Sequence, residues 1–498
     1  MDNKIYKIFF INFIIFRLLL SPINVYALSK NETINSLNLI ISVDQFVNKQ
    51  DNKRIYFQDN NLEKAIRDKI NKPKGEIYVS DVNGIQELTI HHQKISNLEG
   101  IQYLTGLKKL DLWFDEITNI KQLSSLTNLE YLRLGYNKIV DISPLSNLTN
   151  LTELNLESNK ITDISVLNNL TKLKALSLYS NKVSDLKPLS ALNHLQSLDL
   201  YINQIENIDP LGKLTNLTDL SLGMNKISNI DSLKNLTKLT TLELAQNFLA
   251  DIKSLSYLSN LDYLNLYGNQ VTDIRPLNSL KNLQYLELSN NKINDVEGLS
   301  SLNNLKNLSL DRNEIKELKG LGALKNLKNL GLGYNNIRDI DELGLLHTLV
   351  SLSVNNNNIS NINALSNLSN LKNLDISNNQ IKEISSIRNL PDLLLTSIDF
   401  SGNPLPEYVF KDKLNQQFIL SMLSPYIDEA VKNYYGEFRQ YMDAGILDIE
   451  QTKEGYRLKV KIETFVGPHN PPYGLDTLTI TKNNGEIKVE EFKHEDVD

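Results

Sequence analysis

A 22-residue phrase that recurs without a slip is the strongest constraint on how this chain folds. The segment LTNLTELNLESNKITDISVLNN, residues 148–169, follows LTNLEYLRLGYNKIVDISPLSN and precedes LTKLKALSLYSNKVSDLKPLSA. An asparagine marks the same point of twelve successive repeats: Asn137, Asn159, Asn181, Asn203, Asn225, Asn247, Asn269, Asn291, Asn313, Asn335, Asn357 and Asn379. Gln93 and Asp115 occupy this point in two earlier repeats, and a last repeat ends at Asn403 after a two-residue insertion. Such self-similarity is typical of solenoids, in which each repeat is one coil.

The apolar residues of each repeat keep two different spacings. Leu154 and Leu156 stand five and three positions before Asn159, and Ile161 and Ile164 stand two and five positions after it. Alternation predicts a short strand, because successive side chains of a strand point to opposite faces. Spacing of three predicts 3-10 turns, in which residues i and i+3 stack. We therefore expect each coil to contain a strand, a turn at the asparagine, and a 3-10 return.

The asparagines have a mechanical explanation. After the strand the backbone turns inward and leaves amide and carbonyl groups that no sheet pairs. An asparagine side chain offers two donor hydrogens and an acceptor oxygen, so it can bond these groups in its own coil and in the neighbouring one. An unpaired buried backbone group costs about 1–3 kcal/mol. We expect the twelve asparagines to form a structural ladder rather than a ligand-binding site.

The consensus LxxLxxLxLxxNxIxDIxPL resembles the leucine-rich repeat, in the 22-residue form of the bacterial internalins, over residues 85–403. The resemblance implies an α/β solenoid, a right-handed horseshoe with short parallel strands on its concave face and 3-10 turns on its convex face. Residues 57–73, FQDNNLEKAIRDKINKP, resemble the helical N-terminal cap of that family. Their pattern is that of an amphipathic helix with a capping box at Asn60 and Glu63, which would cover the open apolar end of the solenoid.

The first 27 residues have the pattern of an export signal. Lys4 and Lys7 precede an apolar run at residues 8–20, and VYA at 25–27 offers a small residue for cleavage. The alternative is a membrane anchor, but the run is shorter than the roughly 18–20 residues of a span, and Arg17 interrupts it. We expect a secreted, extracellular or surface-associated chain. Its parts are a linker of uncertain structure at 28–54, a cap at 55–84, leucine-rich repeats at 85–407 and a small α+β domain at 408–498.

The segment after the repeats loses the 22-residue period. Residues 411–445 have a helical pattern, with Ser424 and Pro425 as the N-cap and first residue of a second helix. GYRLKVKIETF, residues 455–465, alternates like a strand, and residues 478–489 predict a hairpin around Asn484 and Gly485. The stretches LSPYI, YYG and FVGPHNPPYGLDT resemble a domain of unknown function in secreted proteins of Bacillus-like bacteria. Internalins usually carry an immunoglobulin-like domain here, so the chain departs from their pattern.

What varies from repeat to repeat is the exposed inner face: the residues six, four and two positions before each asparagine, and the rim residue directly before it. Aromatic side chains, with one isoleucine, gather there in three groups: His91, His92, Trp113, Phe114, Tyr131 and Tyr136; then Tyr179, Tyr201 and Ile202; then Tyr263, Tyr267 and Tyr285. Binding interfaces are rich in such rings, whereas the alternative is that strand propensity alone places tyrosine on strands. We expect the rings to be exposed, to pack on nothing in the scaffold, and to contact a ligand.

The three inward columns are also acidic. The acids are Glu87, Asp111, Glu153, Glu157, Asp199, Asp219, Glu243, Glu287, Asp311, Asp375 and Asp399, and only Lys109 and Arg133 oppose them. A face of this kind suits a protein ligand with basic and apolar patches. The alternative is a face that is merely solvated. From this set we assign Glu153, Glu157 and Asp199 to the candidate binding site, together with the members of the three groups above other than His92 and Ile202.

Composition and motifs exclude several other functions. A net charge of −7 and the absence of cysteine argue against nucleic-acid binding, disulfides and thiolate metal sites. No phosphate-binding glycine loop, GxSxG or HExxH occurs, and His469 in the loop GPHNPPYG is the only candidate catalytic base. We expect a protein-binding, non-enzymatic module without cofactor or metal. The internalin resemblance implies adhesion to a host surface protein. The alternatives are a partner in the bacterium's own wall, docked by the C-terminal domain, and an enzyme with a catalytic C-terminal domain.

Overall fold

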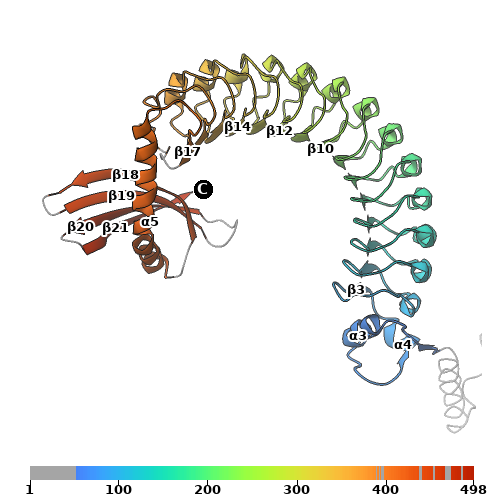
Figure 1. Ribbon diagram of the computed structural model, residues 1–498. Coiled ribbons are helices and arrows are strands. Elements are labelled where there is room, and N and C mark those ends of the chain that lie inside the picture. The colour runs from blue at the N-terminus through green and yellow to red at the C-terminus, as the bar shows by residue number, and fades with distance from the viewer. Residues whose placement is uncertain are drawn as a thin grey trace, which may run out of the picture.

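The computed structural model describes residues 52–388, 390, 391, 393, 397–436, 440–452, 455–465, 473–483 and 486–497. These residues form an open arc of coils with a small domain at its C-terminal end (Figure 1). The export signal, most of the predicted linker, the loop that holds His469 and the turn at Asn484 and Gly485 lie outside the described residues. No helix of the described part is both long enough and apolar enough to cross a membrane.

Fifteen short strands form one parallel sheet along the inner side of the arc, and their order follows the chain (Figure 1). They are β3 (Glu87–Thr89), β4 (Lys109–Asp111), β5 (Tyr131–Arg133), β6 (Glu153–Asn155), β7 (Ala175–Ser177), β8 (Ser197–Asp199), β9 (Asp219–Ser221), β10 (Thr241–Glu243), β11 (Tyr263–Asn265), β12 (Tyr285–Glu287), β13 (Asn307–Ser309), β14 (Asn329–Gly331), β15 (Ser351–Ser353), β16 (Asn373–Asp375) and β17 (Ile398–Asp399). Leu374 of β16 pairs with Ile398 of β17, so the two-residue insertion is absorbed before the last strand.

The outer side of the arc consists of 3-10 turns, one in each of thirteen coils. They are η1 (Ile101–Tyr103), η2 (Lys121–Ser125), η3 (Ser143–Asn147), η4 (Ser165–Asn169), η5 (Lys187–Ala191), η6 (Asp209–Lys213), η7 (Asp231–Asn235), η8 (Lys253–Tyr257), η9 (Arg275–Ser279), η10 (Glu297–Leu299), η11 (Leu321–Ala323), η12 (Asp341–Leu345) and η13 (Asn363–Asn367). In the coil of Asn159, the N–H of Leu167 donates to the carbonyl of Ile164 at 3.0 Å. The predicted solenoid, with parallel strands inside and 3-10 turns outside, is confirmed.

The spaced leucines and isoleucines fill the interior between the sheet and the turns. One continuous apolar core runs from Leu62 and Ile66 in the cap to Val409 beyond the last coil. Burying one such side chain contributes about 1.5–3 kcal/mol. Because each coil packs only on its neighbours, both ends of the stack need a cover.

The N-terminal end is covered by a small cap. Strand β1 (Arg54–Ile55) pairs antiparallel with β2 (Ile77–Tyr78), and the helices α3 (Asn60–Lys69) and α4 (Val79–Val82) complete the cap. The predicted capping box at Asn60 and Glu63 is wrong by one position, because Asp59 is the N-cap of α3. Its Oδ1 accepts the N–H groups of two residues in the first turn, and its Oδ2 accepts that of Ser96 in the first coil. Asp59 therefore joins the cap to the solenoid, a contact that no local pattern reveals.

The C-terminal end is covered by helix α5 (Glu407–Tyr435), which leads into a four-stranded antiparallel sheet. The strands are β18 (Gln440–Gln451), β19 (Gly455–Phe465), β20 (Tyr473–Asn483) and β21 (Glu486–Val497). The predicted restart at Ser424 and Pro425 is wrong, because α5 continues through Pro425. Proline inside a helix costs about 3 kcal/mol. Ile427 and Val431, after the proline, are buried in the core of the sheet, and this burial offsets the cost.

Candidate protein-binding face

The asparagine ladder fixes the point where each strand ends. Asn137 shows the pattern: its Nδ2 donates to the carbonyls of Leu112, Leu134 and Gly135 at 2.9, 3.0 and 3.2 Å, and its Oδ1 accepts the N–H of Ile117 at 3.0 Å. The other eleven asparagines make the equivalent bonds; Asn225, for example, donates to the carbonyl of Leu200 in the preceding coil and to those of Leu222 and Gly223 in its own coil. The ladder holds every coil in the same conformation, so the columns before it present their side chains in register.

The rim residue directly before the ladder has a left-handed backbone in nearly every coil. These residues, with φ between 50° and 67°, are His92, Phe114, Tyr136, Ser158, Ser180, Ile202, Met224, Gln246, Gly268, Asn290, Arg312, Tyr334, Asn356 and Asn378. Glycine and asparagine tolerate this region, whereas bulky side chains and especially β-branched ones are strained there. The fold therefore explains Gly268 and Asn290, but it gives no reason for Phe114, Tyr136 or Ile202.

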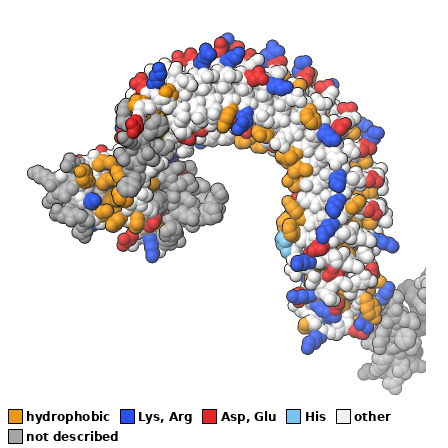
Figure 2. All heavy atoms as spheres, in the orientation of Figure 1, with side chains coloured by type: hydrophobic (Ala, Val, Ile, Leu, Met, Phe, Trp, Pro, Cys, Tyr) orange, Lys and Arg blue, Asp and Glu red, His pale blue; other side chains and the backbone are white. Residues whose placement is uncertain are grey.

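An N-terminal aromatic patch forms where three of these rim residues follow one another. We define it as His91, His92, Trp113, Phe114 and Tyr136. The ring of Phe114 lies 4.4 Å from His92 and 5.6 Å from Tyr136, and Trp113 lies 5.1 Å from Tyr136 between ring centroids. Phe114 and Tyr136 are exposed. Figure 2 shows hydrophobic side chains on the inner edge of the N-terminal limb, beside a histidine.

The charged side chains beside this patch are paired with one another. The guanidinium of Arg133 lies 4.8 Å from the Trp113 ring centroid, 3.8 Å from Asp111 and 3.6 Å from Glu157. Trp113 Nε1 donates to Glu157 Oε1 at 3.0 Å. The expectation that Trp113 packs on nothing is therefore wrong. Trp113, Arg133 and Glu157 lie on three successive coils, with Trp113 and Glu157 44 positions apart in the sequence, which is why single-coil patterns do not reveal the contact.

Tyr131 lies apart from the ring contacts of this patch. The Lys109 ammonium lies 5.0 Å from the Tyr131 ring centroid. Burial, followed by the charge of Asp111, raises the pKa of the Tyr131 hydroxyl. Glu153, on the next strand, is exposed.

A middle patch forms further along the face. We define it as Glu243, Tyr263, Asn265, Tyr285 and Glu287. The two tyrosine rings stack with centroids 4.7 Å apart and planes 9° from parallel. Asn265 Nδ2 donates to Glu243 Oε2 at 2.8 Å, and Tyr263 Oη lies 3.5 Å from the same oxygen. Between Arg133 and Asp399 the three inward columns contain no lysine or arginine.

Burial shapes the acid–base properties of the middle patch. It raises the pKa of Glu243, against the effect of the backbone N–H of Ala245. Burial and the charge of Glu243 raise the pKa of Tyr263 to about 12. The pKa of Tyr285 is also raised, first by burial and then by the charge of Glu287. A cationic group placed on this patch would compensate the carboxylates and face two stacked rings.

The remaining predicted residues lie between or beside these patches. Tyr179 and Tyr201 stack at 5.8 Å, and Tyr267 shows no ring contact among the described residues. Asp199 Oδ1 accepts the N–H of Tyr201 at 3.0 Å, as Glu243 Oε1 accepts that of Ala245 at 2.8 Å. The acidic side chains four positions before the ladder thus accept hydrogen bonds from the backbone, and they also lie on the inner face where we expect the ligand. Burial raises the pKa of Asp199.

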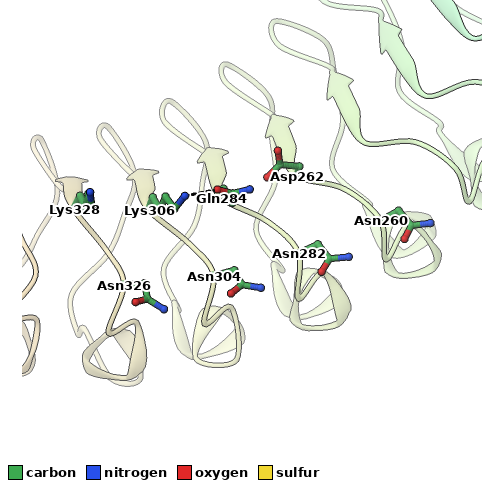
Figure 3. Close-up of a pocket in the computed structure, with 8 residues that line it drawn as sticks. All are labelled: Asn260, Asp262, Asn282, Gln284, Asn304, Lys306, Asn326 and Lys328. Atoms are coloured by element: carbon green, nitrogen blue, oxygen red, sulfur yellow. Dashed lines mark hydrogen bonds between the residues drawn. The ribbon is translucent and has the colours of Figure 1, made fainter. Parts of the chain in front are cut away.

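Sequence reasoning missed a second asparagine column on the flank of the solenoid. Its members lie thirteen positions after a ladder position, as Asn150 follows Asn137, and donate to a carbonyl of the preceding coil: Asn128, Asn150, Asn216, Asn260, Asn282, Asn304, Asn326 and Asn370. Figure 3 shows four of them along a groove of ≈ 630 Å³, where Lys306 donates to Gln284 at 2.6 Å. The recurrent LTNL phrase, whose asparagine belongs to this column, was the sequence signal that could have revealed it.

The C-terminal domain contains a buried polar cluster that the sequence analysis also missed. Asp476 is fully buried, and its carboxylate accepts Thr464 Oγ1 at 2.6 Å and Tyr435 Oη at 2.9 Å. His494 Nδ1 lies 2.8 Å from the same carboxylate. The cluster joins α5 to three strands of the sheet. Within the described residues, no group of three or more His, Cys, Asp or Glu side chains is placed to hold a metal ion.

Parallel coils with 3-10 returns and an internal asparagine ladder define a leucine-rich-repeat protein. Residues 127–169, 171–213, 193–235, 215–258 and 259–301 match the model described as Leucine Rich repeats (2 copies), and residues 370–390 match Leucine Rich Repeat. A crystal structure of an internalin (InlF) from Listeria monocytogenes is 35% identical, with a TM-score of 0.62, and the match covers 63% of this chain and 94% of that one. The chain belongs to the internalin family.

Other comparisons extend the description. A leucine-rich-repeat protein of Leptospira interrogans is 27% identical over 67% of this chain and 94% of that one, with a TM-score of 0.60. The plant peptide hormone receptor RGFR1, in complex with RGF2, is 25% identical over 64% of this chain and 54% of that one, with a TM-score of 0.55. Residues 415–496 match a protein family of unknown function (DUF3888). A comparison with curated proteins finds no match.

Proposed function

We propose that this protein is a secreted, internalin-like adhesin that binds a protein ligand on the concave face of its repeats. The binding residues are those of the N-terminal aromatic patch and the middle patch, with Tyr131, Glu153, Glu157, Tyr179, Asp199, Tyr201 and Tyr267 between or beside them. The internalin-like fold is typically a non-enzymatic interaction scaffold. The proposal includes cleavage of the signal at residues 1–27 before the protein acts outside the cell.

This proposal rests on which side chains stand at the rim positions. Phe114 and Tyr136 place large exposed rings at left-handed positions, where the scaffold alone would favour glycine or asparagine. Strained positions persist where function requires them. Exposed aromatic rings are also the side chains that most often dominate binding energy.

The chemistry of the two patches supports a ligand with apolar and basic parts. The N-terminal aromatic patch offers ring surface whose neighbouring charges are already paired, so it suits apolar side chains. The middle patch offers Glu243 and Glu287 beside stacked tyrosines, so it suits a lysine or arginine side chain. We infer a polypeptide that contacts both patches along the arc.

One similar structure and the family of the chain support the kind of partner. The plant receptor that shares this fold is described as a complex with RGF2, and this favours a polypeptide on the repeats. Membership of the internalin family favours a host surface protein. A partner in the bacterium's own wall, docked by residues 408–498, is the competing possibility.

The test uses the mature chain, residues 28–498, as bait for cross-linking capture from host-cell surface extracts and from bacterial wall extracts. We expect the double variant Phe114→Asn/Tyr136→Asn to lose the captured protein by about tenfold or more, as for interface anchors. Gln246→Asn is the matched control, because it places the same side chain at an equivalent left-handed rim position outside both patches.

The outcomes separate the alternatives. Loss of capture with the double variant and not with the control supports the concave-face adhesin. Undiminished capture of a wall component by the double variant would favour docking through the C-terminal domain and would contradict the proposal.

A further inference from the structure

Asp115 places a carboxyl group where the twelve following coils place an amide. Its Oδ1 accepts the N–H groups of Gln93 and Ile95 at 3.0 and 3.1 Å. In the next coil, Asn137 Oδ1 accepts the N–H of Ile117 at 3.0 Å in the same way. Ile95 and Ile117 each lie 20 positions before their partner. The carboxyl of Asp115 therefore occupies the ladder position in the same orientation as an asparagine side chain.

The second carboxyl oxygen stands where an asparagine has its amide nitrogen. Asn137 Nδ2 donates to three carbonyls, which lie 25, 3 and 2 positions earlier in the chain. The repeat places the carbonyls of Ile90, Leu112 and Trp113 at these points around Asp115. Asp115 Oδ2 is buried and accepts no hydrogen bond within the described part of the chain. A carboxylate oxygen has no hydrogen to donate, so in its ionised form it would face carbonyl oxygens without a partner.

We propose that Asp115 carries a proton on Oδ2 and donates it to one of these carbonyls, so that the ladder is complete at this coil only while the carboxyl is neutral. Protonation makes the side chain equivalent to an amide with one donor hydrogen. One of the three neighbouring carbonyls then accepts a hydrogen bond of the kind that the twelve asparagines donate elsewhere. The ladder positions from Asn137 to Asn379 are all asparagines, whose neutral amides cannot change their charge in this way.

The surroundings of Asp115 include features that raise its pKa and features that lower it. Burial raises the pKa of Asp115 above its ordinary value of 3.8, against the backbone N–H groups of the preceding coil and the charge of His91. The titratable and charged groups that line the same hollow as Asp115 or act on it by charge are His91, His92 and Lys94 on the preceding coil, Glu116 on its own coil and Lys138 on the following coil. Asp111 pairs with His91 and with Arg133. Several are paired with each other: His91 with Asp111 at 3.0 Å and Lys138 with Glu116 at 3.1 Å.

Loss of the proton would loosen the N-terminal aromatic patch. Asp115 follows Trp113 and Phe114 directly, so its side chain fixes the turn that carries both rings. Because folding raises the pKa, the stabilisation is complete below pH 3.8 and is lost as pH rises through the folded-state pKa. The consequence for ligand binding rests on the proposed function, whereas the protonation itself does not.

Hydrogen exchange of the unliganded chain, read between pH 4 and 8 and corrected for the intrinsic rate, tests the inference. We expect protection of residues 93–95 and 113–115 to fall with rising pH, by about tenfold for each pKa unit by which folding raises the carboxyl. Asp115→Asn should remove this dependence and be the better protected protein at the alkaline end. Asn137→Asp should create the same dependence one coil later.

A second measurement reads the proton directly. The infrared difference spectrum between the chain and Asp115→Asn should contain the C=O band of a protonated carboxylic acid above pH 3.8. An ionised carboxylate band at every pH above that value would overturn the proposal. So would a pH dependence of exchange that is unchanged in Asp115→Asn. Neither result depends on a ligand, so the proposed function stands or falls separately.

Discussion

The N-terminal aromatic patch lies one and two positions before the ladder, the middle patch lies four and six positions before it, and the two patches differ in how the carboxylates around them are paired with cations. Around Trp113, the guanidinium of Arg133 lies within 4 Å of both Asp111 and Glu157. Around Tyr263 and Tyr285, Glu243 and Glu287 have no lysine or arginine in the inward columns of their coils. The backbone is alike in both places. The carboxylates beside the first patch are paired with a cation of the protein itself, whereas those of the second patch are paired only when a ligand brings positive charge.

The largest expected difference concerns stability. Trp113→Ala removes ring contacts, a cation–π contact and the hydrogen bond to Glu157, so we expect the free energy of unfolding to fall by about 2 kcal/mol. Tyr263→Ala removes one stacked partner, and we expect a loss of about 1 kcal/mol. Chemical unfolding followed by circular dichroism measures both. Equal losses would show that the two patches are built alike.

Removing a charged side chain should lower the free energy of unfolding at the first patch and leave it unchanged or raise it at the second. Arg133→Ala leaves Asp111 and Glu157 without their cation, and we expect a loss of about 1 kcal/mol after allowance for solvent screening. Glu243→Gln removes a carboxylate whose pKa burial has raised. It keeps an acceptor for Ala245, so we expect a change within about 0.5 kcal/mol, neutral or stabilising. Destabilisation by Glu243→Gln as large as that by Arg133→Ala, in the same unfolding experiment, would remove the contrast.

The titration of Tyr263 sharpens the description of the middle patch. We expect a tyrosine with a pKa of about 12 in the ultraviolet titration of the chain, absent from Tyr263→Phe and lowered in Glu243→Gln. Folding raises this pKa above 10.0, so the corresponding stability is present in full below pH 10.0 and is lost as pH rises through about 12. An unchanged value in Glu243→Gln would mean that the carboxylate does not influence the ring.

A further effect on stability concerns the rim between the patches. Ile202 has a φ of 55°, a region that β-branched residues avoid. We expect Ile202→Asn to raise the free energy of unfolding by about 0.5–1 kcal/mol. The reverse change, Asn356→Ile, is the matched control at an equivalent rim position and should lower it by a similar amount. Stabilisation by Asn356→Ile would show that the rim tolerates branched residues, and the argument from strain would fail.

The fold follows from the sequence because each coil repeats the same short-range rule. The spacing of residues such as Leu154 and Ile164 determines the strand and the turn, and a one-coil rule extends along the whole arc. The candidate site follows only in part. The column positions of Trp113 and Tyr263 could be predicted, but their partners Glu157 and Glu243 lie two coils and one coil away, and their pairing depends on side-chain rotamers.

The predictions at the two ends of the solenoid failed where tertiary contacts override local signals. Asp59, and not Asn60, caps α3 because its second oxygen reaches the first coil at Ser96. Helix α5 passes through Pro425 because its two halves bury residues in two cores. Neither contact has a signature in the neighbouring sequence.

The affinity of the captured ligand for paired variants tests the central claim most directly. Trp113→Ala and Tyr263→Ala should each weaken binding by about 2 kcal/mol or more, as expected of interface anchors. Lys213→Ala and Lys234→Ala, which lie in the 3-10 turns η6 and η7 on the convex side, should leave the affinity unchanged. Binding that survives the loss of both rings but fails on replacement of the convex lysines would contradict the claim that the concave face recognises the ligand.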